Sequence, residues 1–498
     1  MTTSIRRHFP FPLSISVALL GVCSQCLPTS IRGQELSSPL TLDSAPVVVA
    51  PRITDLHGRE NPDDQQAVIR FSEHADLWDT AKLRHPPAGS LPTHENPSMQ
   101  RTESLVTGYD EGFYIQTVDQ DTAPFRLRVN LQSQFRYTNF NPQQATWTDA
   151  GGQINPLAAR NDFEINRGRL IFSGHAVDKD LNYYLNLDYA TLGDDRVTIL
   201  LAWMSYRFSR SLELFYGKGK VVGSREWLVT SMATQGPERT MATTFFRPSI
   251  TAGVWARGEP LDRIYYQAVV GNGFNTAAIG FRDLDTNFVY SANLWHEPLG
   301  EFGLLFSDWQ GSANPVLRWG GSLTTSRQSG TQFNRSEPED SFIRLSDGTD
   351  LTTPGALAPG VTVTDYSVSL ATLDAGIKYQ GWSLHSEYFL RWLSDIRGTG
   401  PIPQARRNLF DHGVFILGGR FLVPQHHELY LRTSAVYGPF GSGSEWGGGW
   451  NWFIKKHPNW RCTFDIAHIN RSPTEQIRTG YEAGASGFLY RLQIQTTY

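Results

Sequence analysis

The feature that most constrains this chain is the two-residue alternation of residues 125–137, which read FRLRVNLQSQFRY. Apolar and polar side chains fall on opposite parities, so a β-strand here has one apolar face and one face of arginines and amides. A half-buried strand of a soluble protein shows the same alternation. A face with three arginines and three amides is more typical of a water-filled lumen, with the apolar face toward lipid. The stretch predicts a membrane barrel strand, provided that the pattern recurs.

The alternation recurs from about residue 108 to the end of the chain. We assign strands near residues 125–137, 169–176, 182–189, 197–208, 211–217, 250–257, 264–271, 287–295, 316–326, 370–380, 382–392, 412–421, 427–437, 446–455, 460–469 and 482–498. Residues 302–308 also alternate, but counting them gives an odd number of strands. An even number places both ends of the barrel on one side of the membrane, so we leave 302–308 in a connection and predict sixteen strands.

The connections alternate in length as well. Short ones lie near 177–180, 209–211, 259–262, 380–382, 424–426 and 457–459, whereas long ones cover about 138–162, 218–249, 327–369 and 393–411. Short periplasmic turns and long external loops are typical of outer-membrane barrels. The predicted fold is an all-β transmembrane antiparallel barrel of about sixteen strands, with lipid-facing Leu127, Val129, Leu131, Leu185 and Leu187.

Two soluble folds compete with this interpretation. A propeller repeats a motif every ~40–50 residues, and the chain shows no such repeat. A β-sandwich would turn one strand parity into a dry core, and the polar parity here is too rich in Arg, Asn, Gln and Asp for that. The missing repeat and the polar parity both favour the membrane barrel over these two soluble folds.

The chain divides into three parts. Residues 1–34 resemble a secretory signal peptide, with Arg6 and Arg7 before the apolar core LSISVALLGVC. Lipidation at Cys23 is the less favoured alternative, because Val22 is bulky for the position before the cysteine. Residues 35–107 lack sustained periodicity and are predicted to form a periplasmic linker of low order, and 108–498 form the barrel domain. The expected location is the outer membrane of a bacterium with a two-membrane envelope.

Positive charge is carried almost entirely by arginine, since only seven of the 44 basic residues are lysines. The excess of arginine over lysine has an explanation without functional meaning, which is a compositional bias of the genome. In the long loop 218–249, five basic residues face only Glu226 and Glu238. If this loop folds inward, it narrows the pore and lines the narrowing with cations, which favour anions. If it stays outside, these are ordinary solvated charges.

Enzyme motifs are sparse. The mature chain has no GxSxG elbow, no HExxH and no P-loop, and we expect no catalytic residue, metal or cofactor and no nucleic-acid partner. Two alternatives to a pore are an outer-membrane enzyme of the phospholipase type and a structural anchor without an open pore. The enzyme would need His and Ser on one outward face, whereas Ser383 and His385 share the lumen parity.

Several motifs together resemble the phosphate-selective porins of the porin O and P family. They are GYDEGFYIQTVDQDTAPFRLRVNLQSQFRY (108–137), NRGRLIFSG (166–174), GKGKVVGSREW (217–227) with the downstream PERTMATT, and VVGNGFN (269–275). The resemblance covers about residues 108–498. It implies a sixteen-stranded trimeric barrel in outer-membrane lipid, with an arginine ladder that guides phosphate or other small anions to a constriction lined by lysines.

Carried over by motif, the resemblance assigns ten candidate anion-binding residues. The ladder candidates are Arg126, Arg128, Arg136, Arg167 and Arg169, and the constriction candidates are Lys218, Lys220, Arg225, Arg239 and Arg247. The scarcity of lysine departs from the family pattern and leaves a general anion porin as the alternative to strict phosphate selectivity. Each arginine has a second interpretation as a structural partner of a lumen carboxylate, such as Asp188, Glu387 or Asp465.

Overall fold

A computed structural model describes residues 105–191, 197–274, 287–329 and 343–498. The predicted signal peptide and nearly all of the predicted linker lie outside the described residues. The description that follows concerns the unit that contains the strands.

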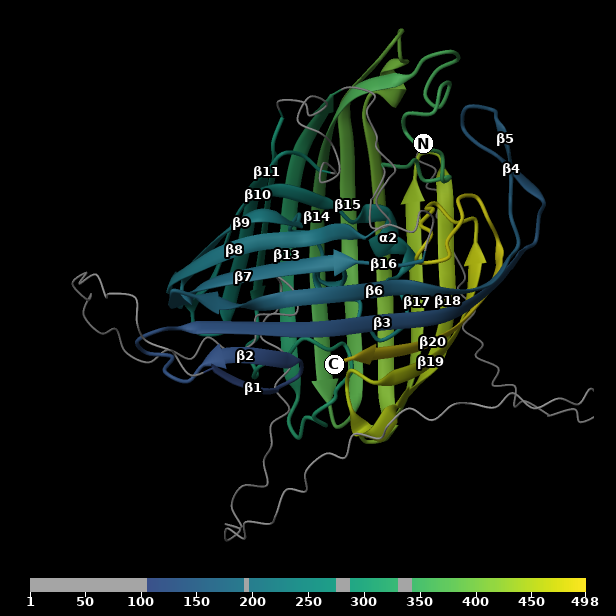
Figure 1. Cartoon of the computed structure of the whole chain (residues 1–498). Coiled ribbons are helices and arrows are strands. Elements are labelled where there is room, and N and C mark those ends of the chain that lie inside the picture. Colours follow the sequence, from purple (N-terminus) through teal and green to yellow (C-terminus); the bar gives the residue numbers. More distant parts are fainter. Residues whose placement is uncertain (1–104, 192–196, 275–286, 330–342) are drawn as a thin grey trace, which may run out of the picture. The chain divides into compact units, whose positions relative to one another are not determined.

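Sixteen strands of the described residues form the barrel wall. They are β3 (Phe125–Pro142), β6 (Arg160–Ala176), β7 (Asp178–Asp188), β8 (Thr198–Ser209), β9 (Leu212–Lys220), β10 (Ile250–Leu261), β11 (Ile264–Gly271), β12 (Val289–His296), β13 (Val316–Ser329), β14 (Val363–Tyr379), β15 (Trp382–Gly398), β16 (Leu409–Val423), β17 (His427–Gly438), β18 (Gly441–Phe453), β19 (Arg461–Asn470) and β20 (Gly487–Thr497). Each wall strand pairs antiparallel with its neighbours in sequence (Figure 1).

The wall closes where β20 meets β3. Eleven residue pairs join these strands, from Gly487 opposite Pro142 to Thr497 opposite Gln132, and Tyr498 continues the ladder with bonds to Leu131. Closure leaves no unpaired edge in the wall, which is the condition for a sheet to cross lipid. The closed antiparallel barrel of sixteen strands predicted from the alternation is confirmed.

The two strand parities have different surroundings. In β14 the inward Val368, Leu370 and Thr372 are buried, whereas the outward Leu373 is 63% exposed. The five leucines and valines predicted to face lipid occupy the half-exposed parity of β3 and β7, opposite buried amides such as Asn130 and Asn186. The alternation therefore predicted correctly which face of these strands points outward.

One end of the wall carries the short turns, the start of β3 and Tyr498, and we call it the turn end. The opposite, loop end carries the longer loops, with the small hairpin β4 (Thr146–Thr148) and β5 (Ile154–Pro156) and the 3-10 helix η1 (Gln404–Arg406). A second 3-10 helix, η2 (Ile454–Lys456), lies in a turn between β18 and β19. Residues 302–308 belong to a connection at the turn end and form no strand, as predicted.

A short hairpin at the turn end was not predicted. It consists of β1 (Leu105–Tyr109) and β2 (Phe113–Thr117), and β2 pairs with β3 from Arg126 to Val129. This is the stretch of β3 that β20 does not reach, so the hairpin continues the wall beyond the end of β20. Residues 105–107, which the sequence assigned to the linker, are thus part of β1.

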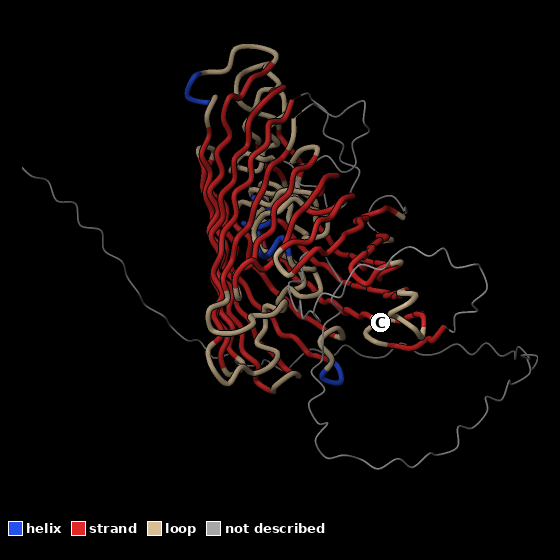
Figure 2. The backbone as a smooth tube through the Cα atoms, turned by 90° about the vertical axis from the view of Figure 1, so that its left-hand side faces the viewer, coloured by secondary structure: helices blue, strands red, loops and turns tan. Residues whose placement is uncertain are grey.

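Chain segments from both ends occupy the space inside the wall. Every residue of 221–250 is buried, and this segment contains the helices α1 (Arg225–Leu228) and α2 (Met241–Phe246). The helix α2 packs against β15, β16 and β17, and Figure 2 shows helix and loop within the ring of strands. Residues 471–486, predicted in part as the start of the last strand, instead fold inward, with Tyr481 and Ala485 buried. None of the helices in the described ranges has the length and apolar character of a membrane-spanning helix.

A lipid-facing belt predicts that the cost of an outward charge depends on its depth in the membrane. Leu373 lies near the middle of β14 and Leu422 near the turn end of β16, and both are outward and exposed. We expect Leu373→Arg to lower the free energy of unfolding in lipid vesicles by about 2–4 kcal/mol and Leu422→Arg by about 0–1 kcal/mol. Reversible denaturant titration measures both. Equal costs would contradict the assignment of a lipid-facing belt.

Candidate functional site: the loop inside the barrel

The candidate site is the segment of residues 221–249, which we call the inner loop. The loop leaves β9 and returns to β10, and the Val221 amide donates to the Ser249 carbonyl at 2.9 Å across its base. Two helix caps shape it locally: Ser224 Oγ accepts from the Trp227 amide, and Thr240 Oγ1 accepts from the Thr243 amide. Serine and threonine are preferred at such positions because they satisfy an amide that the helix leaves open.

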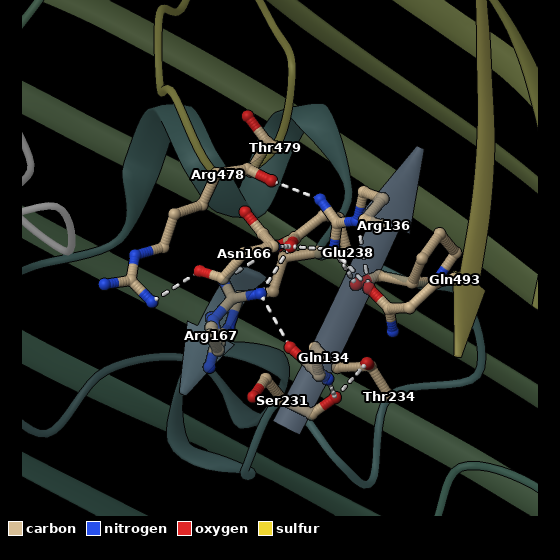
Figure 3. A network of polar contacts seen from close by, with 12 residues as sticks. Gln134, Arg136, Asn166, Arg167, Ser231, Thr234, Glu238, Arg478, Thr479 and Gln493 are labelled. Atoms are coloured by element: carbon tan, nitrogen blue, oxygen red, sulfur yellow. Dashed lines mark hydrogen bonds and ion pairs between the residues drawn. The ribbon is translucent and has the colours of Figure 1, made fainter. Parts of the chain in front are cut away.

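Glu238 fixes the inner loop to the wall (Figure 3). Its Oε1 accepts from Arg136 Nη2 at 2.5 Å and from Asn166 Nδ2 at 2.8 Å, and Arg167 binds both carboxylate oxygens, with Nη2 3.0 Å from Oε2. Arg136 also donates to the carbonyls of Pro237 and Arg478 and to Gln493 Oε1. Two of the five ladder candidates are therefore partners of one loop carboxylate.

The environment of Glu238 sets its charge. Burial by itself would raise the pKa of the carboxyl, but the positive charges and hydrogen bonds of Arg167 and Arg136 outweigh burial and hold the pKa far below its usual value of 4.5. Because the folded pKa is depressed, the contact contributes stability above the ordinary pKa and loses it only as the pH falls toward the depressed value. The anchor therefore survives mild acid.

A second anchor joins α2 to the wall. The amides of Met241 and Ala242, at the start of the helix, donate at 2.8 Å to Glu445 Oε1 and to Ser434 Oγ. Glu226 accepts from Thr240 through the amide and through Oγ1, and burial raises the pKa of the Glu226 carboxyl. Carboxylates at a helix start satisfy open amides and interact favourably with the helix dipole. The acids of this region thus serve the loop's own amides.

Arg225 joins the inner loop to the turn-end connection between β12 and β13. Its Nη1 donates to His385 Nδ1 at 3.0 Å, and its guanidinium lies 4.7 Å from the Phe302 ring centre and 4.6 Å from that of Phe306. His385 Nε2 then donates to the Phe306 carbonyl at 2.6 Å, which defines a neutral imidazole with its proton on Nε2. Burial lowers the pKa of Arg225 to about 9, so the group remains charged at neutral pH.

Lys378 secures the same connection from β14. Its Nζ donates to the Phe302 carbonyl at 2.7 Å and to the Leu305 carbonyl at 2.5 Å. Ser307 Oγ donates to Glu428, and Asp308 accepts from the Gly381 amide. Residues 302–309 consequently lie inside the barrel with Phe306 and Trp309 buried. A segment that the sequence analysis left in a connection therefore contributes to the contents of the lumen.

The other ladder candidates are also paired. Arg126 and Arg128 each bind Asp110, at 2.8 and 3.1 Å, and Arg169 lies 3.7 Å from Asp188. Asp110 belongs to the unpredicted hairpin turn between β1 and β2. All five ladder candidates therefore contact a carboxylate, which is what the second interpretation of these arginines expects.

The remaining loop candidates differ from one another. Lys220 Nζ donates to the carbonyls of Trp227, Leu228 and Val229, and Arg239 donates to those of Glu226 and Val229. Arg247 stacks on Trp227 at 4.6 Å. Lys218 shares the parity of the outward Tyr216 on β9 and donates to the Ile199 carbonyl in an exposed contact. Lys218 thus lies apart from the inner loop.

Sequence reasoning missed several interior arginines. Arg432 and Arg491 share Asp465, Arg478 binds Asp188 at 2.9 Å, and Arg391 binds Asp411 at 2.8 Å. Lumen parity on β17 and β20 could have identified Arg432 and Arg491, but nothing local marks Arg478 in a folded-in loop. Among the described residues, the buried ionisable side chains comprise sixteen Arg or Lys and sixteen Asp or Glu. The buried basic and acidic side chains of the described residues are therefore equal in number.

Groups suited to catalysis are used structurally. Ser383 and His385 both face inward and are buried, as their parity predicted, and Ser383 Oγ accepts from Gln235. In the described ranges, no group of His, Cys, Asp and Glu is arranged to hold a metal ion.

Comparisons with known proteins give only distant likeness. No family model and no curated protein matches this chain. Among solved structures, an anion-selective porin from Comamonas acidovorans is 9% identical, with 75% of this chain and 99% of that chain covered and a TM-score of 0.48. Salmonella typhi OmpF in complex with daunomycin is 12% identical (79% and 100% covered, TM-score 0.46), and the outer membrane channel DcaP of Acinetobacter baumannii is 8% identical (75% and 97%, 0.43). Similarity this distant says nothing about solute or activity. The closed wall itself defines the class, a transmembrane β-barrel with an inner loop.

Removal of the Glu238 carboxylate tests the first anchor. We expect Glu238→Ala to destabilise the docked loop by about 3–5 kcal/mol, because Arg136 and Arg167 then remain buried without their partner. Amide hydrogen exchange of residues 221–249 in the folded barrel is the measurement. Glu301→Ala, at an exposed acid of the turn-end connection, is the matched control and should leave exchange unchanged. Equal exchange in both variants would show that another contact holds the loop.

Proposed function

We propose that this protein is an outer-membrane porin whose inner loop makes the channel selective for small anions, with phosphate or a related oxyanion as solute. The observation that carries the proposal is that residues 221–249 lie wholly inside the wall with Lys220, Arg225, Arg239 and Arg247. Export by the predicted signal peptide, the turn end toward the periplasm and a homotrimeric assembly belong to the same proposal.

The proposal depends on where the charge is compensated. Glu238 is matched by Arg136 and Arg167, and Asp465 by Arg432 and Arg491. The described polar contacts of Arg225, Lys378 and Arg461, by contrast, go to carbonyl oxygens, an imidazole and an amide. Cations held by neutral acceptors keep their attraction for an anion, whereas a paired arginine attracts little.

The size of the electrostatic attraction favours cations that lie in a narrow part of the pore. Unit charges ~4 Å apart interact by about 1 kcal/mol in bulk water and by about 4 kcal/mol at an effective dielectric of about 20. The inner loop reduces the water around Arg225, so its charge contributes toward the larger value. A few such groups around one narrow part of the pore act together on a passing anion.

A second candidate is a barrel without an open path, which anchors the preceding part of the chain in the membrane. One observation favours it: the inward side chains of the described wall strands are almost all buried, and residues 302–309 add to the filling from the turn end. A planar-bilayer recording separates the two, because a porin gives stepwise conductance and a closed barrel gives none. Phospholipid hydrolysis by the same preparation would instead support the enzyme alternative.

Reversal potentials across a salt gradient test the selectivity. We expect Arg225→Gln to lower the anion-to-cation permeability ratio and to weaken phosphate block of the chloride current, because it removes a buried positive charge. Lys218→Gln removes one positive charge at a half-buried, outward position of β9 that lies apart from the inner loop, and the ratio should not change. Equal shifts in both variants, or none in either, would assign the selectivity to other residues.

A further inference from the structure

The outer face of the wall carries an apolar groove over β14–β20. Its volume is about 1080 Å³, just above the ~300–1,000 Å³ typical of small-molecule sites. The side chains that surround it include Leu384, Leu429, Leu431 and Ile466. No aspartate or glutamate lines the groove among the described residues. This part of the lipid-facing surface is therefore hollowed rather than convex.

Two outward glycines form the floor. Gly418 on β16 and Gly448 on β18 lie in one row of paired residues with Leu431 between them. Trp446 and Trp450 flank Gly448 on the same face of β18, so a large indole ring lies on either side of a position without a side chain. A Cβ on Gly418 would meet its nearest atoms at 3.5 and 3.6 Å, which is ordinary contact. Packing within the wall thus leaves room for a side chain at Gly418.

An exposed cation lies at one end of the groove. Arg420 lines it, and its guanidinium stacks on Trp382 at 4.5 Å from the ring centre. Arg420 is paired in register with Trp382, which directly follows the Gln380–Gly381 turn, so Arg420 lies level with the turn end of the wall. The exposed Lys455 and Lys456 lie in a turn at the same end. Apolar surface thus runs from a basic rim toward the middle of the membrane.

We propose that this groove binds an anionic phospholipid of the periplasmic leaflet, with the acyl chains over Gly418 and Gly448 and the phosphate at Arg420. A guanidinium forms two-pronged hydrogen bonds with a phosphate, and stacking on Trp382 holds it in place for that contact. The apolar lining matches acyl chains. With the turn end toward the periplasm, which belongs to the proposed function, the rim lies at the level of that leaflet's headgroups.

Charge distinguishes a phospholipid from a two-fold contact of the groove with itself. In a two-fold contact, each copy would bring the same acid-free groove against its partner, and Arg420 would be buried without a counter-ion. A phosphate supplies that counter-ion. The groove is therefore better matched to lipid than to itself.

Native mass spectrometry tests the proposal. The full chain is reconstituted in bilayers of phosphatidylglycerol and phosphatidylcholine, extracted in mild detergent, and examined for retained lipid and for oligomeric state. We expect retained phosphatidylglycerol on the wild type and about a fivefold loss of retention in Arg420→Gln, which is the contribution of one basic group near an anionic surface. Gly418→Phe should displace the lipid by filling the groove.

Matched controls keep the test specific. Arg263→Gln removes a basic group from another turn at the same end, and Leu323→Phe adds bulk to an outward leucine away from the groove. Both should retain lipid as the wild type does, and heat-modifiable gel mobility confirms that each variant is a folded barrel. Undiminished phosphatidylglycerol in Arg420→Gln and Gly418→Phe would overturn the proposal. A change of oligomeric state without loss of lipid would overturn it in favour of a contact between copies.

Discussion

The structure depends on the closure of its backbone hydrogen bonds across β20 and β3. In lipid an unsatisfied amide or carbonyl costs several kcal/mol, so a sheet crosses only when its last strand returns to its first. The register from Thr497 opposite Gln132 to Gly487 opposite Pro142 achieves this and brings Tyr498 beside Leu131. Closure then forces the polar parity of every strand into a single interior. All the chemistry of the lumen follows from that confinement.

The confined interior explains why loops from both ends fold into it. Buried charges need partners, since the idealised cost of taking one carboxylate or ammonium ion out of water is of order 20 kcal/mol. The inner loop supplies Glu238 to Arg136 and Arg167, the loop at 471–486 supplies Arg478 to Asp188, and the hairpin turn supplies Asp110 to Arg126. The loops and the wall therefore complete each other's electrostatics. Neither side would be satisfied alone.

The alternation in the sequence was enough to predict the fold, because the face on which a strand residue lies depends only on its position in the local chain. It placed all sixteen strands and the lumen side of Ser383, and the parity argument kept residues 302–308 out of the wall. The alternation could not predict which side chains pair, because Arg136 and Glu238 are 102 residues apart and Arg478 and Asp188 are 290 apart. Lys218 and Lys220 share a parity, yet Lys218 is half-buried on the outward face and Lys220 turns into the loop. Only the folded path of the chain separates them.

The cations whose hydrogen bonds go to neutral acceptors also hold a chain segment in place. Arg225 and Lys378 direct their N–H groups at the carbonyls of Gly303, Phe302 and Leu305, which hold the turn-end connection inside the barrel. An anion that reaches these groups competes with the carbonyls for the same donors. Its hydrogen bonds would be charge-assisted on both sides, and such bonds are roughly twice as strong as neutral ones. In the proposed porin, a single set of N–H donors would thus both hold residues 302–309 and attract the solute.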